Sequence, residues 1–212
     1  MKTLLHPAYF PNIATFAVIA QRNIIWEVED NYQKQTYRNR CYVCTDIGRH
    51  MLSIPIQHIG GTQGRQKFKA VLIDNSYPWQ RNHWRTLQTA YRTSPFFEFY
   101  EEDLAPLYLQ TFESLLDFNL KTIQTICDCL QIESPNEKTL EFNLKPKLAN
   151  LKDSRFLVSA KRKLELQQEK YVQVFGDRHG FVENVSVLDL LFNEGTTALS
   201  YLKNQDIDVL YD

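Results

Sequence analysis

The segment FESLLDFNLKTIQTICDCLQ, residues 112–131, decides how the second half of this chain folds. Its apolar residues recur at steps of three and four positions, close to the helical period of about 3.6, so the segment predicts an amphipathic helix with one face in a core. Those residues are Phe112, Leu115, Leu116, Ile123, Cys127 and Leu130. Outward from it, a helix is expected over 83–92, and Ser94 followed by Pro95 is expected to open another.

The end of the chain also favours helix. Ser186 and Asp189 fit a reciprocal capping box at the start of a helix over 187–193, and Gly195 can end that helix before a last one. By contrast, residues 134–170 are polar and charged without a clear period. We expect an irregular or mobile excursion there and assign no chemistry to it.

The first half favours β-strands, because β-branched and aromatic residues cluster in short runs. The predicted strands cover 24–28, 37–45, 51–56 and 69–73, and residues 12–21 suit a short helix. We therefore expect an α+β (or α/β) fold, in which a mixed sheet from the N-terminal half packs with helices mostly from the C-terminal half. The length of 212 residues suits a single domain over 1–212.

Composition excludes several classes of protein. With 24 basic and 25 acidic side chains the formal net charge is -1, which makes a dedicated nucleic-acid binder an unfavoured interpretation. No apolar run reaches the roughly 18 to 20 residues that a membrane span requires. The first residues reach His6 and Pro7 before a signal-peptide core can form, so we expect a cytoplasmic protein.

The charges are unevenly distributed along the chain. Residues 34–92 carry ten basic and two acidic side chains, whereas residues 98–117 carry six acidic side chains and no basic one. The basic region can form an anion site for a phosphate, a pyrophosphate or a carboxylate. It can equally be a solvated basic surface, since closeness in sequence does not guarantee closeness in space.

The four cysteines do not form a convincing metal or redox motif. Cys41 and Cys44 lie three positions apart in a predicted strand and so point to opposite faces, and Cys127 and Cys129 point in different directions on a helix. The glycine-rich nucleotide motifs, the nucleophile elbow and the His-Glu-x-x-His zinc motif do not occur in the sequence. We therefore expect free thiols, no metal and no cofactor.

His6 is the first candidate catalytic residue. It opens the segment HPAYFP, residues 6–11, in which two prolines restrict the backbone around an imidazole that titrates near neutrality. His6 can act as a general base or as a donor to phosphate, and Tyr9 in the same segment is a candidate for substrate binding. The alternative is a rigid aromatic turn in which His6 only hydrogen-bonds a carbonyl.

The segment YQKQTYRNR, residues 32–40, is the strongest candidate for anion recognition. Lys34, Arg38 and Arg40 supply positive charge, and Asn39 can orient a bound group. Arginine offers a planar fork to phosphate or carboxylate, so the set suits a nucleotide, a nucleotide-activated sugar or a carrier phosphate. A solvated run of charges is the alternative.

Two further segments contain candidate residues. His83 and Tyr91 lie on the helix predicted over 83–92, where His83 is a second candidate acid or base and Tyr91 a candidate for substrate binding. Arg178 and His179 lie between two glycines and can line a pocket that binds the substrate. The alternatives are a packed histidine on an aromatic helix and an ordinary surface turn.

Taken together, these segments resemble the WbqC-like protein family. The residues that carry the resemblance are His6 to Pro11, Tyr32 to Arg40, Leu52 to Pro55, Trp79 to Tyr91, Ser94 to Phe97 and Val185 to Gly195. The resemblance runs nearly from end to end. It implies an association with bacterial surface polysaccharide and O-antigen gene clusters, without an established reaction.

Two hypotheses of function follow. The first is a transferase of surface polysaccharide biosynthesis that acts on a small anionic ligand such as a nucleotide-activated sugar, with phosphate held by the basic residues of 34–40 and a proton moved by His6 or His83. The second is a non-catalytic binding or scaffold protein that recognises the same anionic intermediate or a partner enzyme. RNA binding is a weaker third hypothesis, because the net charge is near zero.

Overall fold

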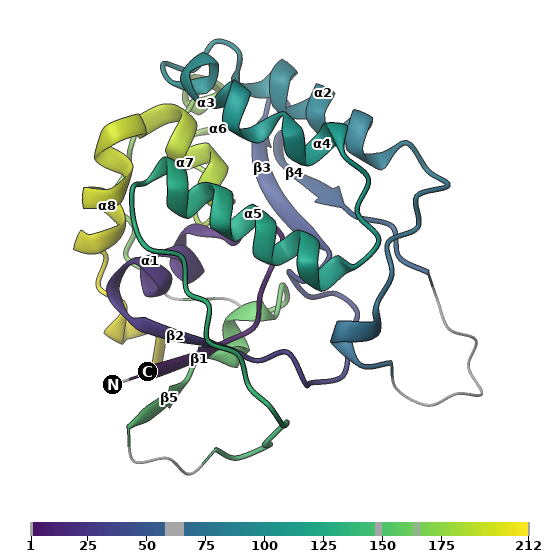
Figure 1. The fold of residues 1–212 in the computed structure, drawn as a ribbon. Helices are drawn as coiled ribbons and strands as arrows, with labels where there is room; N and C mark the ends of the chain where they lie inside the picture. Colours follow the sequence, from purple (N-terminus) through teal and green to yellow (C-terminus); the bar gives the residue numbers. More distant parts are fainter. Residues whose placement is uncertain (1, 58–65, 147–149, 163, 165, 212) are drawn as a thin grey trace.

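A parallel three-stranded sheet places residues 2–5 beside residues 151–153, which are far apart in the sequence. The computed structural model describes residues 2–57, 66–146, 150–162, 164 and 166–211. In it, β1 (Lys2–Leu5) is the central strand between β2 (Asn23–Trp26) and β5 (Leu151–Asp153) (Figure 1). Both neighbours run parallel to β1. The three carboxyl ends therefore meet at one edge of the sheet.

The connection from β1 to β2 is α1 (Ile13–Gln21). Asn12 caps this helix, since its side-chain oxygen accepts a hydrogen bond of 3.0 Å from the amide of Thr15. Its residues from Ile13 to Ile19 are all buried, and α1 packs against α8 (Ala198–Asn204) near the other end of the chain. The helix predicted over 12–21 is thus confirmed.

A separate antiparallel hairpin consists of β3 (Arg40–Thr45) and β4 (Gly48–Ser53). Gly48 follows the turn with φ +90°, a value that side chains disfavour. The strand predicted over 69–73 is wrong. A 3₁₀ turn, η1 (Phe68–Ala70), occupies its first two residues, and Leu72 and Ile73 make only isolated bridges, to Ser114 and Ile56. Single bridges do not make a ladder.

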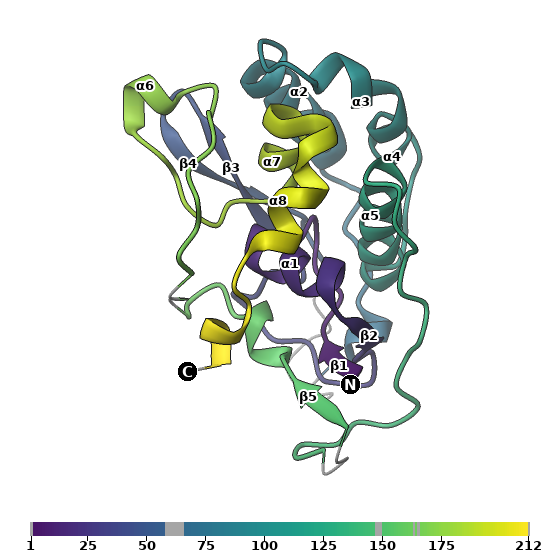
Figure 2. The same cartoon turned by 90° about the vertical axis from the view of Figure 1, so that its left-hand side faces the viewer.

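Helices dominate the middle and the end of the chain. They are α2 (Trp79–Tyr91), α3 (Phe97–Leu104), α4 (Pro106–Leu109), α5 (Leu115–Cys129), α6 (Gly176–His179), α7 (Val187–Glu194) and α8. Figure 1 shows α5 running across the face of the molecule, and Figure 2 shows α7, α8 and α1 down the middle of the view, with the hairpin on the left and α5 on the right. The α+β fold is confirmed, with the helices mostly in the second half. No helix among the described residues is long and apolar enough to cross a membrane.

Local capping signals predicted some helix ends and missed others. The long helix α5 starts at Leu115 rather than 112, because Ser114 caps it by accepting from the amide of Asp117. Ser94 does not open a helix. Its hydroxyl donates to the Tyr91 carbonyl at 2.6 Å and so closes α2, and α3 starts only at Phe97.

Of the two side-chain hydrogen bonds expected in the C-terminal capping box, the one from Ser186 forms and the one from Asp189 does not. The Ser186 hydroxyl accepts from the amide of Leu188 at the start of α7, as expected. The Asp189 carboxylate does not return to Ser186, because Tyr91 and Tyr171 donate to it instead. At the other end of α7, Gly195 has φ +53° and ends the helix as predicted.

For the segment 134–170 the sequence predicts an irregular or mobile excursion without chemistry. Its described residues are largely irregular, but they include the third strand, β5, and the short η2 turn (Arg155–Val158). A strand of three residues carries too little pattern to be recognised in sequence. Its place beside β1 brings Asp153 and Arg155 to the edge of the sheet where His6 lies.

Candidate functional site

The candidate site lies at the carboxyl edge of the parallel sheet. His6 directly follows β1, Glu27 directly follows β2, and Arg155 comes two residues after β5. After β1 the chain forms β2 on one side of it, and much later it forms β5 on the other side. The direction in which strands are added to the sheet therefore reverses between β1 and β5. Open parallel sheets bind ligands outside the carboxyl ends of their strands, at the point of such a reversal.

A cavity of about 380 Å³ occupies this position, and we call it the histidine pocket. Its polar lining residues are His6, Asp30, Gln33, Arg38, Asp153, Arg155 and Ser159. Apolar side chains, including Phe142 and Phe156, complete the wall. His6 and Arg38, which the sequence proposed from two different segments, therefore share one cavity.

His6 is a neutral imidazole with both ring nitrogens engaged. Its Nε2 lies 3.0 Å from Nη2 of Arg38, and its Nδ1 lies 3.2 Å from the backbone oxygen of Glu27. A guanidinium can only donate, so Nε2 accepts and Nδ1 carries the hydrogen that it donates to Glu27. Burial lowers the pKa of His6 well below its usual value, and the positive charge of Arg38 lowers it further.

Asp30 gives the same ring nitrogen a second partner. Its Oδ2 lies 3.4 Å from Nε2 of His6 and accepts a 3.0 Å hydrogen bond from Nη2 of Arg38. When Nε2 is unprotonated it accepts from Arg38, and when it takes up a proton it faces a carboxylate. The arrangement can therefore hold His6 in either protonation state, with the neutral state favoured at rest.

Arg38 is completely buried, at 0% exposure, yet two of its nitrogens are free of hydrogen bonds. Within the described residues, Nε and Nη1 have no hydrogen-bond partner. The guanidinium carbon lies 5.3 Å from the centre of the Phe68 ring, which supports the charge from the other side. Unpaired buried donors cost free energy, so the guanidinium of Arg38 is only partly satisfied by the described residues.

Arg155 is fully engaged, unlike Arg38. It binds Asp153 with two hydrogen bonds, of 2.9 and 2.6 Å, and donates to the backbone oxygens of Asn143 and Leu144. One of its nitrogens also lies 3.5 Å from the buried carboxylate of Glu27. Arg155 thus neutralises acidic groups at the edge of the sheet.

The other predicted basic residues line a neighbouring cavity of about 300 Å³, which we call the cation pocket. Lys34, Asn39 and Arg40 line it together with Tyr32 and residues 53–56, and none of the described lining residues is acidic. Nε of Arg40 and Oδ1 of Asn39 are buried without a hydrogen-bond partner among the described residues. The cation pocket therefore carries uncompensated positive charge.

Tyr32 links the two cavities electrostatically. Burial raises the pKa of its hydroxyl, and the positive charges of both Arg40 and Arg38 oppose that rise. Both arginines are thus close enough to Tyr32 to act on its charge. Residues 32–40 form one wall that serves both cavities, with Arg38 facing the histidine pocket and Arg40 facing the cation pocket.

The second candidate histidine, His83, lies elsewhere. It is 6% exposed on α2, with its Nδ1 2.9 Å from the Tyr9 hydroxyl, which in turn lies 3.0 Å from the Tyr108 hydroxyl. The ring packs edge-on against Trp79. Burial lowers the pKa of His83 to about 4. His83 and Tyr9 are not among the residues that line the histidine pocket, and their contacts are those of packed core residues.

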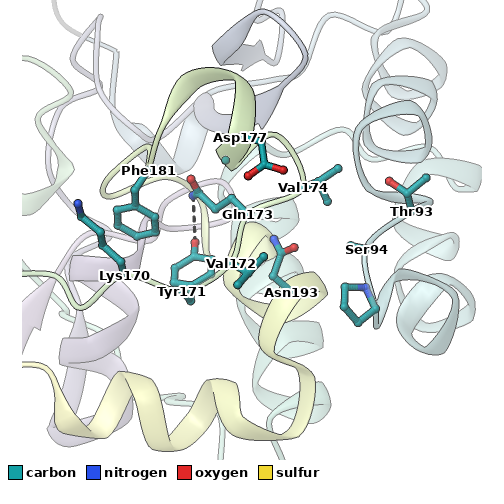
Figure 3. Close-up of a pocket in the computed structure, with 12 residues that line it drawn as sticks. Thr93, Ser94, Lys170, Tyr171, Val172, Gln173, Val174, Asp177, Phe181 and Asn193 are labelled. Carbon is teal, nitrogen blue, oxygen red and sulfur yellow. Dashed lines mark hydrogen bonds between the residues drawn. The ribbon is translucent and has the colours of Figure 1, made fainter.

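Tyr91 belongs to a buried network rather than to the histidine pocket. Its hydroxyl accepts from the amide of Cys44 and donates to the Asp189 carboxylate at 2.7 Å. Tyr171 and Gln173 donate to the other oxygen of Asp189, at 2.6 and 2.9 Å. Figure 3 shows Tyr171, Gln173 and Asn193 at the edge of a cavity of about 480 Å³ beside this network. Asp189, which is satisfied on both oxygens, ties three segments together.

Arg178 and His179 lie at the turn of the β3–β4 hairpin. His179 Nε2 is in hydrogen-bond contact with the backbone oxygen of Asp46, and Arg178 donates to the same oxygen at 3.4 Å. Figure 2 shows α6, which carries both residues, beside the hairpin and away from β1 and β5. The structure thus separates these two predicted residues from His6 and Arg38.

The four cysteines are free thiols. Burial raises the pKa of Cys44 to about 11 and that of Cys129 to about 12, so neither favours the reactive thiolate at neutral pH. No group of three or more histidine, cysteine or acidic side chains in the described part of the chain is arranged to hold a metal ion.

Sequence reasoning missed the residues that complete the histidine pocket. Asp30 comes two residues after the predicted strand 24–28 and Glu27 lies near its end, at the edge of a parallel sheet where ligands bind, so this signal was available. Arg155 carried no signal, because β5 was not recognised as a strand.

Comparison with known proteins is consistent with this picture. The profile of the WbqC-like protein family matches residues 6–168, a span that holds both the histidine pocket and the cation pocket. An uncharacterised protein of Mycobacterium tuberculosis is 30% identical over 224 aligned positions, which cover 92% of this chain and 94% of the relative. No solved structure matches the chain significantly. On these grounds the chain belongs to the WbqC-like protein family.

Proposed function

We propose that this protein is a transferase that binds an anionic activated substrate in the cation pocket and moves a proton through His6 in the histidine pocket. The observation that carries the proposal is the contact between Nε2 of His6, Nη2 of Arg38 and Oδ2 of Asp30 at the carboxyl edge of the sheet. A site for anions alone has no need of an imidazole that faces both a donor and a carboxylate.

Charge assigns different parts of the substrate to the two cavities. The cation pocket has Lys34 and Arg40 without a described acidic neighbour in its lining, so it suits the phosphate of an activated donor. The histidine pocket holds the acidic side chains of Asp30 and Asp153 beside its arginines, so it suits a neutral acceptor with a hydroxyl or amino group. An activated sugar, such as a nucleotide-activated sugar, has the required phosphate.

The chemistry follows from the two partners of His6. A proton passes from the acceptor hydroxyl or amine to Nε2 of His6, and the freed electron pair forms a bond to the activated carbon of the donor. The bond from that carbon to the phosphate oxygen breaks, and the phosphate leaves with the electron pair, held by Lys34 and Arg40. The imidazolium that results donates to Asp30. Acid or base catalysis of this kind contributes roughly 10² to 10⁴-fold in rate.

The test is a thermal-shift and turnover screen with nucleotide sugars and acyl donors. We expect a ligand that stabilises the wild type, loses this effect in Arg40→Gln and keeps it in Lys121→Gln, a matched loss of charge on the exposed surface of α5. His6→Asn should retain ligand binding and lose turnover by at least 100-fold. Equal stabilisation of the wild type and Arg40→Gln by every ligand that binds would refute the anion site.

One observation favours the non-catalytic alternative. In the structure the lone pair of His6 Nε2 is already occupied by Arg38, so His6 can instead be a fixed support that positions the guanidinium. A binding or scaffold protein for the same anionic intermediate needs nothing more. Ligand binding by the wild type that depends on Arg40, without turnover of any donor tested, would select this function over the transferase.

A further inference from the structure

We propose that a second pocket, separate from the candidate site, binds a phosphate-bearing ligand at the turn of the β3–β4 hairpin. This turn pocket is a cavity of about 550 Å³. Its polar lining residues are Thr45, Asp46, His50, Arg85, Thr86, Thr89 and Arg178, and they come from the hairpin, from α2 and from the α6 segment. Three parts of the chain that are far apart in sequence thus supply its wall.

The cations of the turn pocket are largely unused by the protein itself. The side chain of Arg85 on α2 makes no hydrogen bond or ion pair among the described residues. Within the part of the chain that the structure describes, the Arg178 side chain donates only to the backbone oxygen of Asp46, at a long 3.4 Å. Asp46 is the one acidic side chain in the described lining, so two arginines face a single carboxylate. The described lining of the pocket therefore has an excess of positive charge.

The number and direction of the donors indicate phosphate rather than carboxylate. Each arginine presents a planar fork that is satisfied by two acceptor oxygens, and His50 and the Thr89 hydroxyl add further donors from other sides. A carboxylate has only two oxygens in one plane. A phosphate, and still more a pyrophosphate, has enough oxygens around a tetrahedral centre to use them.

The wall that carries Arg178 is held in place by an independent contact. The ring of His179 makes a hydrogen bond to the backbone oxygen of Asp46, which ties α6 to the hairpin turn. Figure 2 shows α6 lying against the end of the hairpin. Phe175, on the same segment, adds an aromatic face next to Ala90 of α2. Donors held by such a contact lose little freedom when a ligand binds.

The turn pocket is distinct from the cation pocket. Arg40, which lines the cation pocket, starts β3, and Thr45, which lines the turn pocket, ends it. At about 3.3 Å per residue, five steps along a strand separate the two positions by roughly 16 Å. One phosphate cannot contact both sets of cations, so the two pockets can be tested separately.

The experiment is a calorimetric titration of pyrophosphate into the full chain with the cation pocket disabled by Lys34→Gln and Arg40→Gln. We expect one pyrophosphate per chain at low salt. Adding Arg85→Gln and Arg178→Gln should weaken the affinity at least tenfold. Adding Arg81→Gln, which removes a charge from the exposed surface of the same helix outside the lining, should change it less than twofold. Circular dichroism establishes that each variant is folded.

A parallel titration with a nucleoside diphosphate identifies the source of the phosphate. Tighter binding than pyrophosphate, lost on Phe175→Leu, supports a nucleotide whose base stacks on that ring. Equal affinity supports recognition of the phosphate groups alone. No binding at millimolar pyrophosphate, or an equal loss with Arg81→Gln and with the Arg85 and Arg178 pair, would overturn the proposal. The proposed function stands or falls independently, because its test depends on Arg40 and His6, and neither lines the turn pocket.

Discussion

Replacing His83 by glutamine should remove much of the acid sensitivity of this protein. His83 is buried on α2 against Tyr9 and Trp79, and burial is the largest cause of its lowered pKa. A backbone hydrogen bond to Ser53 raises the pKa in part, and the electrostatic effect of His50 lowers it by a smaller amount. The folded protein therefore keeps this imidazole neutral at a pH where the unfolded chain protonates it.

The size of the effect follows from the two pKa values. The imidazole titrates near 6.5 in the unfolded chain and at about 4 in the folded protein. As the pH falls below 6.5, the unfolded state binds the proton first, so the free energy of unfolding decreases until the pH reaches the folded value. Between pH 7.5 and 5.0 this linkage amounts to about 2 kcal/mol, and it approaches about 3 kcal/mol below pH 4.

The assay is urea denaturation at pH 7.5 and at pH 5.0, with unfolding monitored by circular dichroism. His83→Gln is expected to be less stable than the wild type at pH 7.5, because it disturbs the contact with Tyr9. It should lose about 2 kcal/mol less than the wild type on going to pH 5.0. His6 also has a lowered pKa, but it is present in both proteins and cancels in the comparison. Equal losses in the two proteins would show that His83 is not a buried neutral imidazole.

Three further changes test other parts of the structure. Gly195→Ala places a Cβ 2.4 Å from the ring of Phe96 at a φ of +53°. It should therefore lower the free energy of unfolding by at least about 2 kcal/mol in urea denaturation. An unchanged midpoint would contradict the helix end described here. Asp189→Asn should cost about 2 to 4 kcal/mol in the same assay because it disturbs a carboxylate that accepts from two tyrosine hydroxyls; a cost below about 0.5 kcal/mol would refute the network. Burial raises the pKa of Cys44 from 9.0 to about 11. At pH 8 this cysteine should therefore react with iodoacetamide roughly 100-fold more slowly in the folded protein than in urea, as measured by peptide mass spectrometry. Comparable rates would contradict its burial.

Several features could be predicted from the sequence because they depend on neighbours along the chain. The apolar stripe of α5 and the Ser186 cap of α7 are local patterns, and both helices formed where expected to within a few residues. The basic character of residues 32–40 was equally visible. These predictions succeed because the helical period and the cap hydrogen bonds involve residues at most four positions apart.

Other features could not be predicted because their causes are distant in sequence. Residues 30–39 are mostly turns and bends, and they direct Arg38 into the histidine pocket and Arg40, the first residue of β3, into the cation pocket. A cluster that is continuous in sequence therefore divides between two cavities. Ser94 and Pro95 carried a helix-start signal that lost to a hydrogen bond with the end of the preceding helix.

By itself the sequence determined the long helix α5, the capped start of α7, which residues are apolar enough to be buried, and the excess of basic side chains in residues 34–92. Only the tertiary structure decided that β5 pairs with β1, which brings Arg155 and Asp153 beside His6, and that His83 is packed among aromatic rings apart from that site. The physical reason is that pairing between Leu4 and Asp153 is stabilised by backbone hydrogen bonds and burial, which every strand can offer. The choice of partner therefore depends on the whole packed core and not on any local signal.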